Sequence, residues 1–286
     1  MTTDPLSPDQ LAAYLERLGL PERPSPTLAG LAAVQRAHMQ AVPFENLDVF
    51  LGCPLSLAID DLFDKVVARR RGGYCFELNT LYAALLRTLG FGTTPVMARV
   101  WLRDPPATPT RNHLAHLVTL GGRRYLSDVG FGGYTARQPV DVDAAEPTDD
   151  GEGRIRVVDA PPYGRMLQRE LDGVWGDQYS FDGAHVAAQD VVAANHFMQT
   201  HPLSHFRENR FAARFTPTGR RGLFDAQLTR RSYNAETGQH DRKEETVPLD
   251  DSWLVRLESD FGIRLPGLTP AERARLLQPH ASAPEA

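Results

Sequence analysis

The sequence of 286 residues is poor in cysteine, in long apolar runs and in excess positive charge. Its two cysteines, Cys53 and Cys75, are too few for a disulfide framework in a chain of this length. No apolar run approaches the length that spans a bilayer. The first ten residues have neither the basic start nor the apolar stretch of a signal peptide. We therefore expect a cytoplasmic protein with no membrane partner.

The formal net charge is −5 at neutral pH. Proteins that bind nucleic acids usually present a basic face, so this balance argues against a nucleic-acid partner. The chain is 42% apolar and 23% charged, which is typical of a globular protein, and it is long enough for one or two folding units with a sizeable core. Composition alone names no activity.

Apolar spacing along the chain predicts helices first and strands afterwards. Apolar residues recur at intervals of three and four over 11–20, 28–40 and 76–90, which predicts three helices. From about residue 94 the period changes to two, which predicts strands over 93–102, 113–120, 123–131, 154–158, 174–181, 209–217 and 220–233. The acidic segment 143–153 is expected to be a mobile loop. Helices are expected again over 250–261 and from a capping box at 269–272.

Residues 71–79 read RGGYCFELN and place Cys75 at the start of the third predicted helix. A lone cysteine at a helix start is more often a buried structural residue than a nucleophile. A helix amino terminus nevertheless stabilises a thiolate, and Gly72 and Gly73 permit the close approach that presents Cys75 there. Arg71 has two interpretations, since it either stabilises the thiolate or holds the loop.

The stretch HLAHLVTLGGRRYLSDVGFGG selects one of the nine histidines as a partner for an aspartate. If Gly121 and Gly122 form a two-residue hairpin turn, cross-strand partners have residue numbers that sum to 243. His113 then shares a face with Asp128 as its diagonal neighbour, whereas His116 points to the other face. A longer loop or a bulge would shift the register, and a shift by one residue would reverse that choice. Such a pair is also common as an ordinary hydrogen-bonded pair.

In this order along the chain, the segments resemble the arylamine N-acetyltransferase family. RGGYCFELN is similar to the family's signature around its catalytic cysteine, and the stretch from His113 to SDVGFGG is similar to the one that carries its catalytic histidine and aspartate. PFENL (43–47) and THPLSHF (200–206) resemble two further elements of the family. The similarity extends over nearly the whole chain and is loose after about residue 215. It implies a catalytic triad of Cys75, His113 and Asp128.

The resemblance also implies the fold class, which is α+β with several domains and a cysteine-protease-like Cys-His-Asp core. A helical domain that carries the nucleophilic cysteine is expected over 1–92. A β-barrel domain that carries the histidine and the aspartate is expected over 93–194, and an α/β lid domain over 195–286.

The chemistry that the resemblance implies is acetyl transfer from acetyl-CoA, as cosubstrate, to a small aromatic amine or hydrazine. Ping-pong kinetics through an acetyl-Cys75 intermediate are expected, with a thiolate–imidazolium pair between Cys75 and His113. No permanently bound cofactor and no metal are implied. The amine pocket falls on three residues that core packing explains equally well, Phe44, Phe131 and Phe206. The CoA contacts fall near Thr110, Ser204 and His205.

Several alternatives stay open on the sequence. Thiol hydrolases and transglutaminases use cysteine, histidine and aspartate in the same chain order but act without CoA. Within the family, some members are amide synthases that close macrolactams. A catalytically dead binding protein is a further alternative, against which the three intact residues argue. The sequence leaves the physiological amine, the preferred acyl chain and the oligomeric state undetermined.

Overall fold

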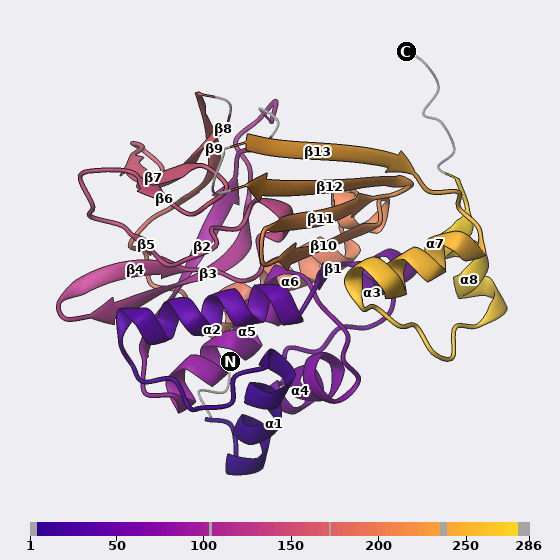
Figure 1. Ribbon diagram of the computed structural model, residues 1–286, viewed down its shortest axis with the longest axis horizontal. Coiled ribbons are helices and arrows are strands. Elements are labelled where there is room, and N and C mark those ends of the chain that lie inside the picture. The colour runs from indigo at the N-terminus through magenta and orange to yellow at the C-terminus, as the bar shows by residue number, and fades with distance from the viewer. Residues whose placement is uncertain (1–4, 103–104, 172, 235–238, 280–286) are drawn as a thin grey trace.

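A computed structural model of the protein describes residues 5–102, 105–171, 173–234 and 239–279. The described chain runs from helices through two antiparallel sheets to helices again (Figure 1). Residues 1–4, in the amino-terminal stretch that lacks signal-peptide features, and residues 103–104, in a proline-rich predicted loop, lie outside the described part. None of the described helices combines the length and the apolar character that a membrane span needs.

The helical part agrees closely with the three predicted helices. Its elements are α1 (Pro8–Leu18), α2 (Leu28–Ala41), α3 (Leu47–Leu51), α4 (Ile59–Phe63), a π-helical turn (Asp64–Ala68) and α5 (Cys75–Thr88). Ser7 caps α1 in a capping box with Gln10, and Gly19 ends it with a φ of 70°. Leu28, the first residue of α2, is 43% exposed, whereas Leu31 and Val34 on the next turns are buried.

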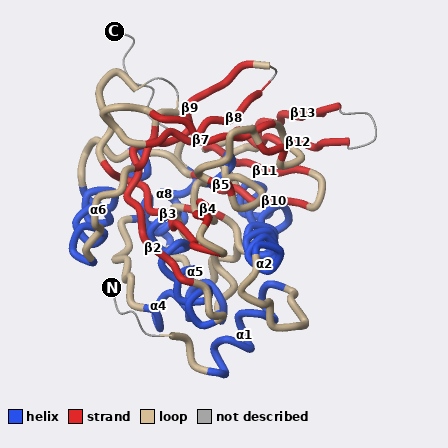
Figure 2. The backbone as a smooth tube through the Cα atoms, turned by 90° about the vertical axis from the view of Figure 1, so that its left-hand side faces the viewer, coloured by secondary structure: helices blue, strands red, loops and turns tan. Residues whose placement is uncertain are grey.

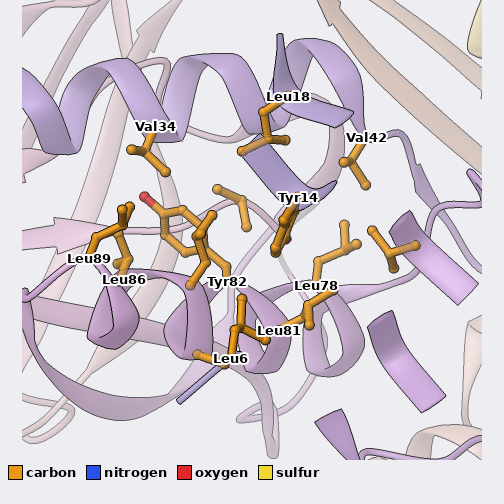
Figure 3. Close-up of a cluster of buried hydrophobic side chains, with 14 of the residues drawn as sticks. Leu6, Tyr14, Leu18, Val34, Val42, Leu78, Leu81, Tyr82, Leu86 and Leu89 are labelled. Carbon is orange, nitrogen blue, oxygen red and sulfur yellow. The ribbon is translucent and has the colours of Figure 1, made fainter. Parts of the chain in front are cut away.

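Helix α5 is the centre of the helical part. All of residues 75–86 are buried, so the helix has neighbours on every side. Figure 3 shows side chains of α1, α2 and α5, among them Tyr14, Val34 and Tyr82, meeting in one apolar cluster. Because α5 is surrounded, its polar residues Glu77 and Asn79 must find partners inside the protein.

The larger sheet has the strand order β5-β4-β3-β2-β9-β8-β7-β6 among the described residues and curls into a nearly closed, barrel-like form. Val140 of β5 and Ile155 of β7, near the two ends of that order, pack in one buried cluster. The strands are β2 (Gly92–Val100), β3 (Arg111–Leu120), β4 (Arg123–Ser127), β5 (Val140–Asp141), β6 (Thr148–Asp149), β7 (Arg154–Asp159), β8 (Arg165–Leu171) and β9 (Val174–Phe181). Strand β8 was not predicted, and β4 ends four residues earlier than expected.

The hairpin between β3 and β4 has the predicted register. Gly121 and Gly122 form the turn with φ values of 57° and 79°. His116 pairs with Ser127 and Leu117 with Leu126, so partner numbers sum to 243 as predicted. Two residues with positive φ suit the right-handed twist of a tight hairpin, and only glycine adopts that conformation at no steric cost.

The smaller sheet has the order β1-β10-β11-β12-β13 among the described residues. Its strands are β1 (Phe44–Glu45), β10 (Phe211–Thr216), β11 (Gly219–Phe224), β12 (Gln227–Asn234) and β13 (Gln239–Thr246). The single strand predicted over 220–233 is wrong, because Asp225 takes a φ of 49° and the chain reverses there. Strand β1 comes from the helical part of the chain and pairs with β10.

Three further helices complete the described fold: α6 (Ala188–Thr200), α7 (Asp251–Arg256) and α8 (Pro270–Leu277). α7 continues into a π-helical turn (Leu257–Phe261), and α8 begins at the predicted capping box of Thr269 and Glu272. Both pack on the smaller sheet, where Trp253 and Leu276 share a buried cluster with Leu228. Figure 2 shows α2 and α6 on opposite sides of the strands. α6 crosses the predicted boundary at 194, and the division into three domains stays a prediction.

The acidic segment 143–153 differs from the expected mobile loop. It contains β6, and it buries Asp150 and Glu152, which are 8% and 6% exposed. The carboxylate of Asp150 lies 2.6 Å from the guanidinium of Arg169, and that of Glu152 lies 2.8 Å from Arg137. The prediction of a mobile loop is therefore wrong at these two residues, because Arg169 and Arg137 compensate their charge.

Two buried histidines make the stability of the protein sensitive to acid. His38 lies between Tyr14 and Tyr82, with its Nε2 atom 2.8 Å from the Tyr14 hydroxyl. Burial lowers the pKa of His38 to about 3 and the pKa of His116 to about 4. In the unfolded chain both titrate near ~6.5, so between these values the unfolded state binds more protons and stability falls as the pH falls.

We expect His38→Gln to flatten this dependence. Each buried neutral histidine contributes about 1.4 kcal/mol per pH unit to the slope of the unfolding free energy. Urea unfolding between pH 5.5 and 4.5 should therefore give a slope smaller by about that amount in the variant. Replacement of the exposed His185 by glutamine serves as the control and should leave the slope unchanged. An equal slope in His38→Gln and the wild type contradicts the prediction.

Candidate active site

Two glycines allow the loop before α5 to approach β1. A Cβ atom at Gly72 would collide with the backbone carbonyl of Pro43, and one at Gly73 would lie 2.9 Å from the Glu77 carboxylate. The Gly73 carbonyl accepts a hydrogen bond of 2.9 Å from the backbone N–H of Glu45. The predicted close approach is present, and it brings the chain to Cys75, the first residue of α5.

A buried network of charges lies under this loop. Arg71 donates to Glu45 and to Asp48, both at 2.9 Å, and Lys65 lies 2.6 Å from Asp48 and 2.7 Å from Glu77. Burial alone would raise the pKa of Asp48, but the two cations outweigh it and lower that pKa to about 2. Of the two interpretations of Arg71, these contacts support the one in which it holds the loop.

His113 and Asp128 form the predicted pair. Nε2 of His113, on β3, lies 2.7 Å from Oδ2 of Asp128, which follows β4, and the two residues are 2% and 3% exposed. His116 is on the other face, where its Nε2 atom donates to the backbone carbonyl of Asn79 at 2.8 Å. The hairpin register therefore selected the histidine that contacts the aspartate.

Further donors hold the Asp128 carboxylate in place. Oδ1 accepts from the Asn79 amide and from the backbone N–H of Gly130, both at 2.8 Å, and Oδ2 accepts from the Tyr179 hydroxyl at 3.0 Å. Burial raises the pKa of Asp128, but the neighbouring imidazole and these hydrogen bonds outweigh it and lower the pKa. For His113, burial alone would lower the pKa, but Asp128 together with Cys75 outweighs it and raises the pKa well above its usual value.

The Cys75 thiol is buried and lies beside both the imidazole and the end of β3. Its sulfur is 3.8 Å from the backbone carbonyl oxygen of Asn112, and the proximity of the thiol helps to raise the pKa of the His113 imidazole. The thiol, imidazole and carboxylate therefore come together from three elements: the start of α5, β3 and the residue after β4. A cysteine beside an imidazole that is itself bound by a carboxylate has the arrangement in which a histidine can act as the base for a thiol nucleophile.

Sequence reasoning missed two residues of this arrangement. Asn79 lies one helical turn after Cys75, so its place on the same face of α5 could have been found from the spacing of four. Besides Asp128, its amide binds the Leu114 carbonyl at 2.7 Å and the Val129 N–H at 3.1 Å. Tyr179 reaches the site from β9, and no local pattern in the sequence marked it.

The three phenylalanines predicted for an amine pocket lie around the thiol and the imidazole. Phe44 and Phe206 pack on the cluster that contains Cys75, and their ring centroids are 6.1 Å apart. The Phe131 ring lies 5.1 Å from that of His113 and 4.8 Å from that of Tyr179. All three are partly buried, as expected of rings at the edge of a site.

The three residues predicted near CoA have different surroundings. Thr110 is exposed just before β3, and His205 is exposed with its ring 4.3 Å from that of Phe206. Ser204 is buried, and its hydroxyl donates to the Met198 carbonyl at 2.6 Å. Their assignment to CoA stays a prediction. In the described part of the chain, no three His, Cys, Asp or Glu side chains are grouped so that they could hold a metal ion.

Comparison with known proteins gives consistent matches. A family model described as N-acetyltransferase matches residues 27–269. The chain is 34% identical to the arylamine N-acetyltransferase of Mycolicibacterium smegmatis over 264 residues, which cover 88% of this chain and 92% of the relative. It is 33% identical to an arylamine N-acetyltransferase / N-hydroxyarylamine O-acetyltransferase of Salmonella typhimurium, with coverage of 96% and 98%.

Solved structures agree with these matches. The arylamine N-acetyltransferase from Salmonella typhimurium superposes with a TM-score of 0.86 at 33% identity, covering 96% of this chain and 99% of that one. The enzyme of Mycobacterium marinum, solved in complex with CoA, superposes with a TM-score of 0.85 at 31% identity, with coverage of 93% and 96%. The mixed helical and sheet architecture described above is therefore that of these structures.

Gly130→Ala tests the close contact between the segment after Asp128 and α5. A Cβ atom at Gly130 would lie 2.8 Å from the Cα atom of Cys75 and 2.7 Å from the Asn79 amide nitrogen. Such overpacking should lower the unfolding free energy by about 1–3 kcal/mol, measured by urea unfolding. Gly133→Ala is the matched control, because no heavy atom lies within 4 Å of its Cβ position. If Gly130→Ala and Gly133→Ala have the same unfolding free energy, the close contact between Gly130 and α5 is contradicted.

Proposed function

Because the chain belongs to the arylamine N-acetyltransferase family, we propose that it transfers the acetyl group of acetyl-CoA to an arylamine or hydrazine nitrogen through an acetyl-Cys75 intermediate. The observation that carries this proposal is the convergence of Cys75, His113 and Asp128, with the 2.7 Å bond between the last two. The acetyl donor is proposed from the family and from the CoA complex of the Mycobacterium marinum relative.

In the first half-reaction, the proton of Cys75 resides on His113, and the Cys75 thiolate attacks the thioester carbonyl of acetyl-CoA. The tetrahedral intermediate collapses with cleavage of the bond from carbon to the CoA sulfur. The imidazolium returns its proton to the departing CoA thiolate, and Cys75 keeps the acetyl group as a thioester. Asp128 contributes by holding the ring through Nε2, which leaves the other ring nitrogen for the sulfur.

In the second half-reaction, the amine nitrogen attacks the acetyl-Cys75 carbonyl and the neutral imidazole takes up the amine proton. The bond from carbon to the Cys75 sulfur then breaks, and the thiolate–imidazolium pair is restored. A flat aromatic amine needs an apolar wall on each side, and Phe44, Phe131 and Phe206 are the side chains proposed for it. The two half-reactions in sequence imply ping-pong kinetics.

Intact mass after incubation with acetyl-CoA alone tests the intermediate. We expect the wild-type protein to gain one acetyl group and Cys75→Ala to gain none, because the thioester forms on that sulfur. Cys53→Ala is the matched control and should be acetylated like the wild type. Acetylation of Cys75→Ala at the site would exclude Cys75 as the nucleophile. A wild type that gains no acetyl group and makes no N-acetylaniline instead favours a thiol hydrolase or transglutaminase.

The ion pair with His113 can be tested by the pH dependence of alkylation. In a Cys53→Ala background, iodoacetamide should modify Cys75 rapidly at pH 6, because the nearby imidazolium favours the thiolate. His113→Ala should slow alkylation at pH 6 by about tenfold or more and move the profile to higher pH. His116→Ala removes an equally buried histidine from the opposite face and should leave the profile in place. An unchanged profile in His113→Ala rules out the ion pair.

A further inference from the structure

The chain that follows Asp128 is held by buried side chains from three separate elements. In residues 131–136, the Ala136 carbonyl accepts from the Gln35 amide of α2 at 2.9 Å, and the Thr135 carbonyl lies 3.4 Å from a guanidinium nitrogen of Arg169 on β8. The Gly133 carbonyl accepts from the guanidinium of Arg220 on β11. Main-chain carbonyls in this segment thus depend on partners far away in the sequence.

The charges at this junction explain why the arginines bind the backbone. Asp150 and Glu152 are the carboxylates of the cluster, and they face three arginines. Asp150 accepts hydrogen bonds from both terminal nitrogens of Arg169, while Glu152 forms ion pairs with Arg137 at 2.8 Å and with Arg220 at 3.4 Å. Each guanidinium group has five N–H donors, so the two carboxylates cannot accept hydrogen bonds from all the donors of three arginines. Other donors of these guanidinium groups bind main-chain carbonyls, whereas Nε of Arg169 is buried without a hydrogen-bond partner.

These contacts tie the smaller sheet to the edge of the site. Arg137 donates to the carbonyls of Thr216, the last residue of β10, and Pro217, in the turn that follows, at 2.8 and 2.9 Å. Arg220 extends from β11 over the Tyr134 ring, with 4.7 Å from its Cζ atom to the ring centroid. Arg220 therefore contacts the short 3-10 turn (Gly132–Tyr134) at two points, the Gly133 carbonyl and the Tyr134 ring.

Phe131 directly precedes this turn. Its ring contacts the rings of His113 and Tyr179, which also contact each other. Gly132 has a φ of 75°, and a Cβ atom there would be in ordinary van der Waals contact with the Phe44 ring, at 3.5 Å. If the turn loosens, Phe131 loses its fixed position, whereas His113 keeps its bond to Asp128.

We infer that Arg220 is a positioning residue that fixes Phe131 as a wall of the acceptor site and thereby sets a preference for flat aromatic amines over hydrazine. The inference rests on the proposed function. Arg220 acts only through Gly133 and Tyr134, so acetyl transfer to Cys75 should not need it. A flat ring needs the Phe131 wall, whereas hydrazine is too small to use it.

The test compares Arg220→Gln with Arg221→Gln. Arg221 is the next residue of β11, has its side chain on the opposite face and binds Asp260, so its variant is the matched control. For each protein, kcat/KM is measured with aniline and with hydrazine, and acetyl-enzyme formation is measured by intact mass. We expect Arg220→Gln to lower the aniline-to-hydrazine ratio about tenfold through KM for aniline, with acetyl-enzyme per folded protein unchanged.

A merely structural role of Arg220 would lower both activities together and leave their ratio unchanged, which overturns the inference. An equal fall of the ratio in Arg221→Gln also overturns it. Arg220→Lys keeps the charge beside Glu152 and should recover part of the aniline-to-hydrazine ratio that Arg220→Gln loses. If Arg220→Gln does not fold, Arg220→Lys is compared with the wild type instead. A lower ratio in Arg220→Lys then supports the inference, and an unchanged ratio overturns it. Failure of the wild type to form acetyl-enzyme would instead refute the proposed function itself.

Discussion

The bond between His113 and Asp128 puts two ionisable groups where water cannot reach them, and much of the surrounding structure compensates for this. Each charge would be strongly disfavoured alone, so the carboxylate takes up donors from Asn79, Gly130 and Tyr179, and the imidazole lies between Asp128 and the thiol. The donors come from a helix, a turn and a strand. Loss of any of these elements would leave a buried carboxylate short of partners, which couples the geometry of the site to the integrity of the fold.

Close packing at the start of α5 follows from the same requirement. Asn79 reaches Asp128 only if the segment after β4 lies directly against the helix, and there a Cβ atom at Gly130 would overlap Cys75. The loop before the helix is also closely packed: a Cβ atom at Gly72 would overlap the Pro43 carbonyl, and one at Gly73 would crowd the Glu77 side chain of α5. Glycine is therefore needed on both sides of Cys75, for contact rather than for flexibility.

Two charge clusters hold the segments that flank the site. Lys65 and Arg71 bind the carboxylates beneath the loop before Cys75, and the arginines around Asp150 and Glu152 bind the segment after Asp128. In both, the sign of the charge alone does not predict the role, because an arginine run or an acidic segment is usually solvated. What distinguishes them is burial: Lys65 and Arg71 compensate buried carboxylates, and the buried arginines of the second cluster also donate to main-chain carbonyls and so fix that backbone.

Local patterns in the sequence determined the caps of α1 and α8, the place of Cys75 at a helix start and the β3–β4 register, because each depends on residues a few positions apart. Through that register they also determined that His113, and not His116, faces Asp128. The sequence could not separate β11 from β12, since the reversal depends on Asp225 taking a positive φ, which its residue type does not require. Only the tertiary structure placed Tyr179 on the carboxylate and Arg220 on the Gly133 carbonyl, because such contacts join residues dozens of positions apart and are decided by packing and burial rather than by local pattern.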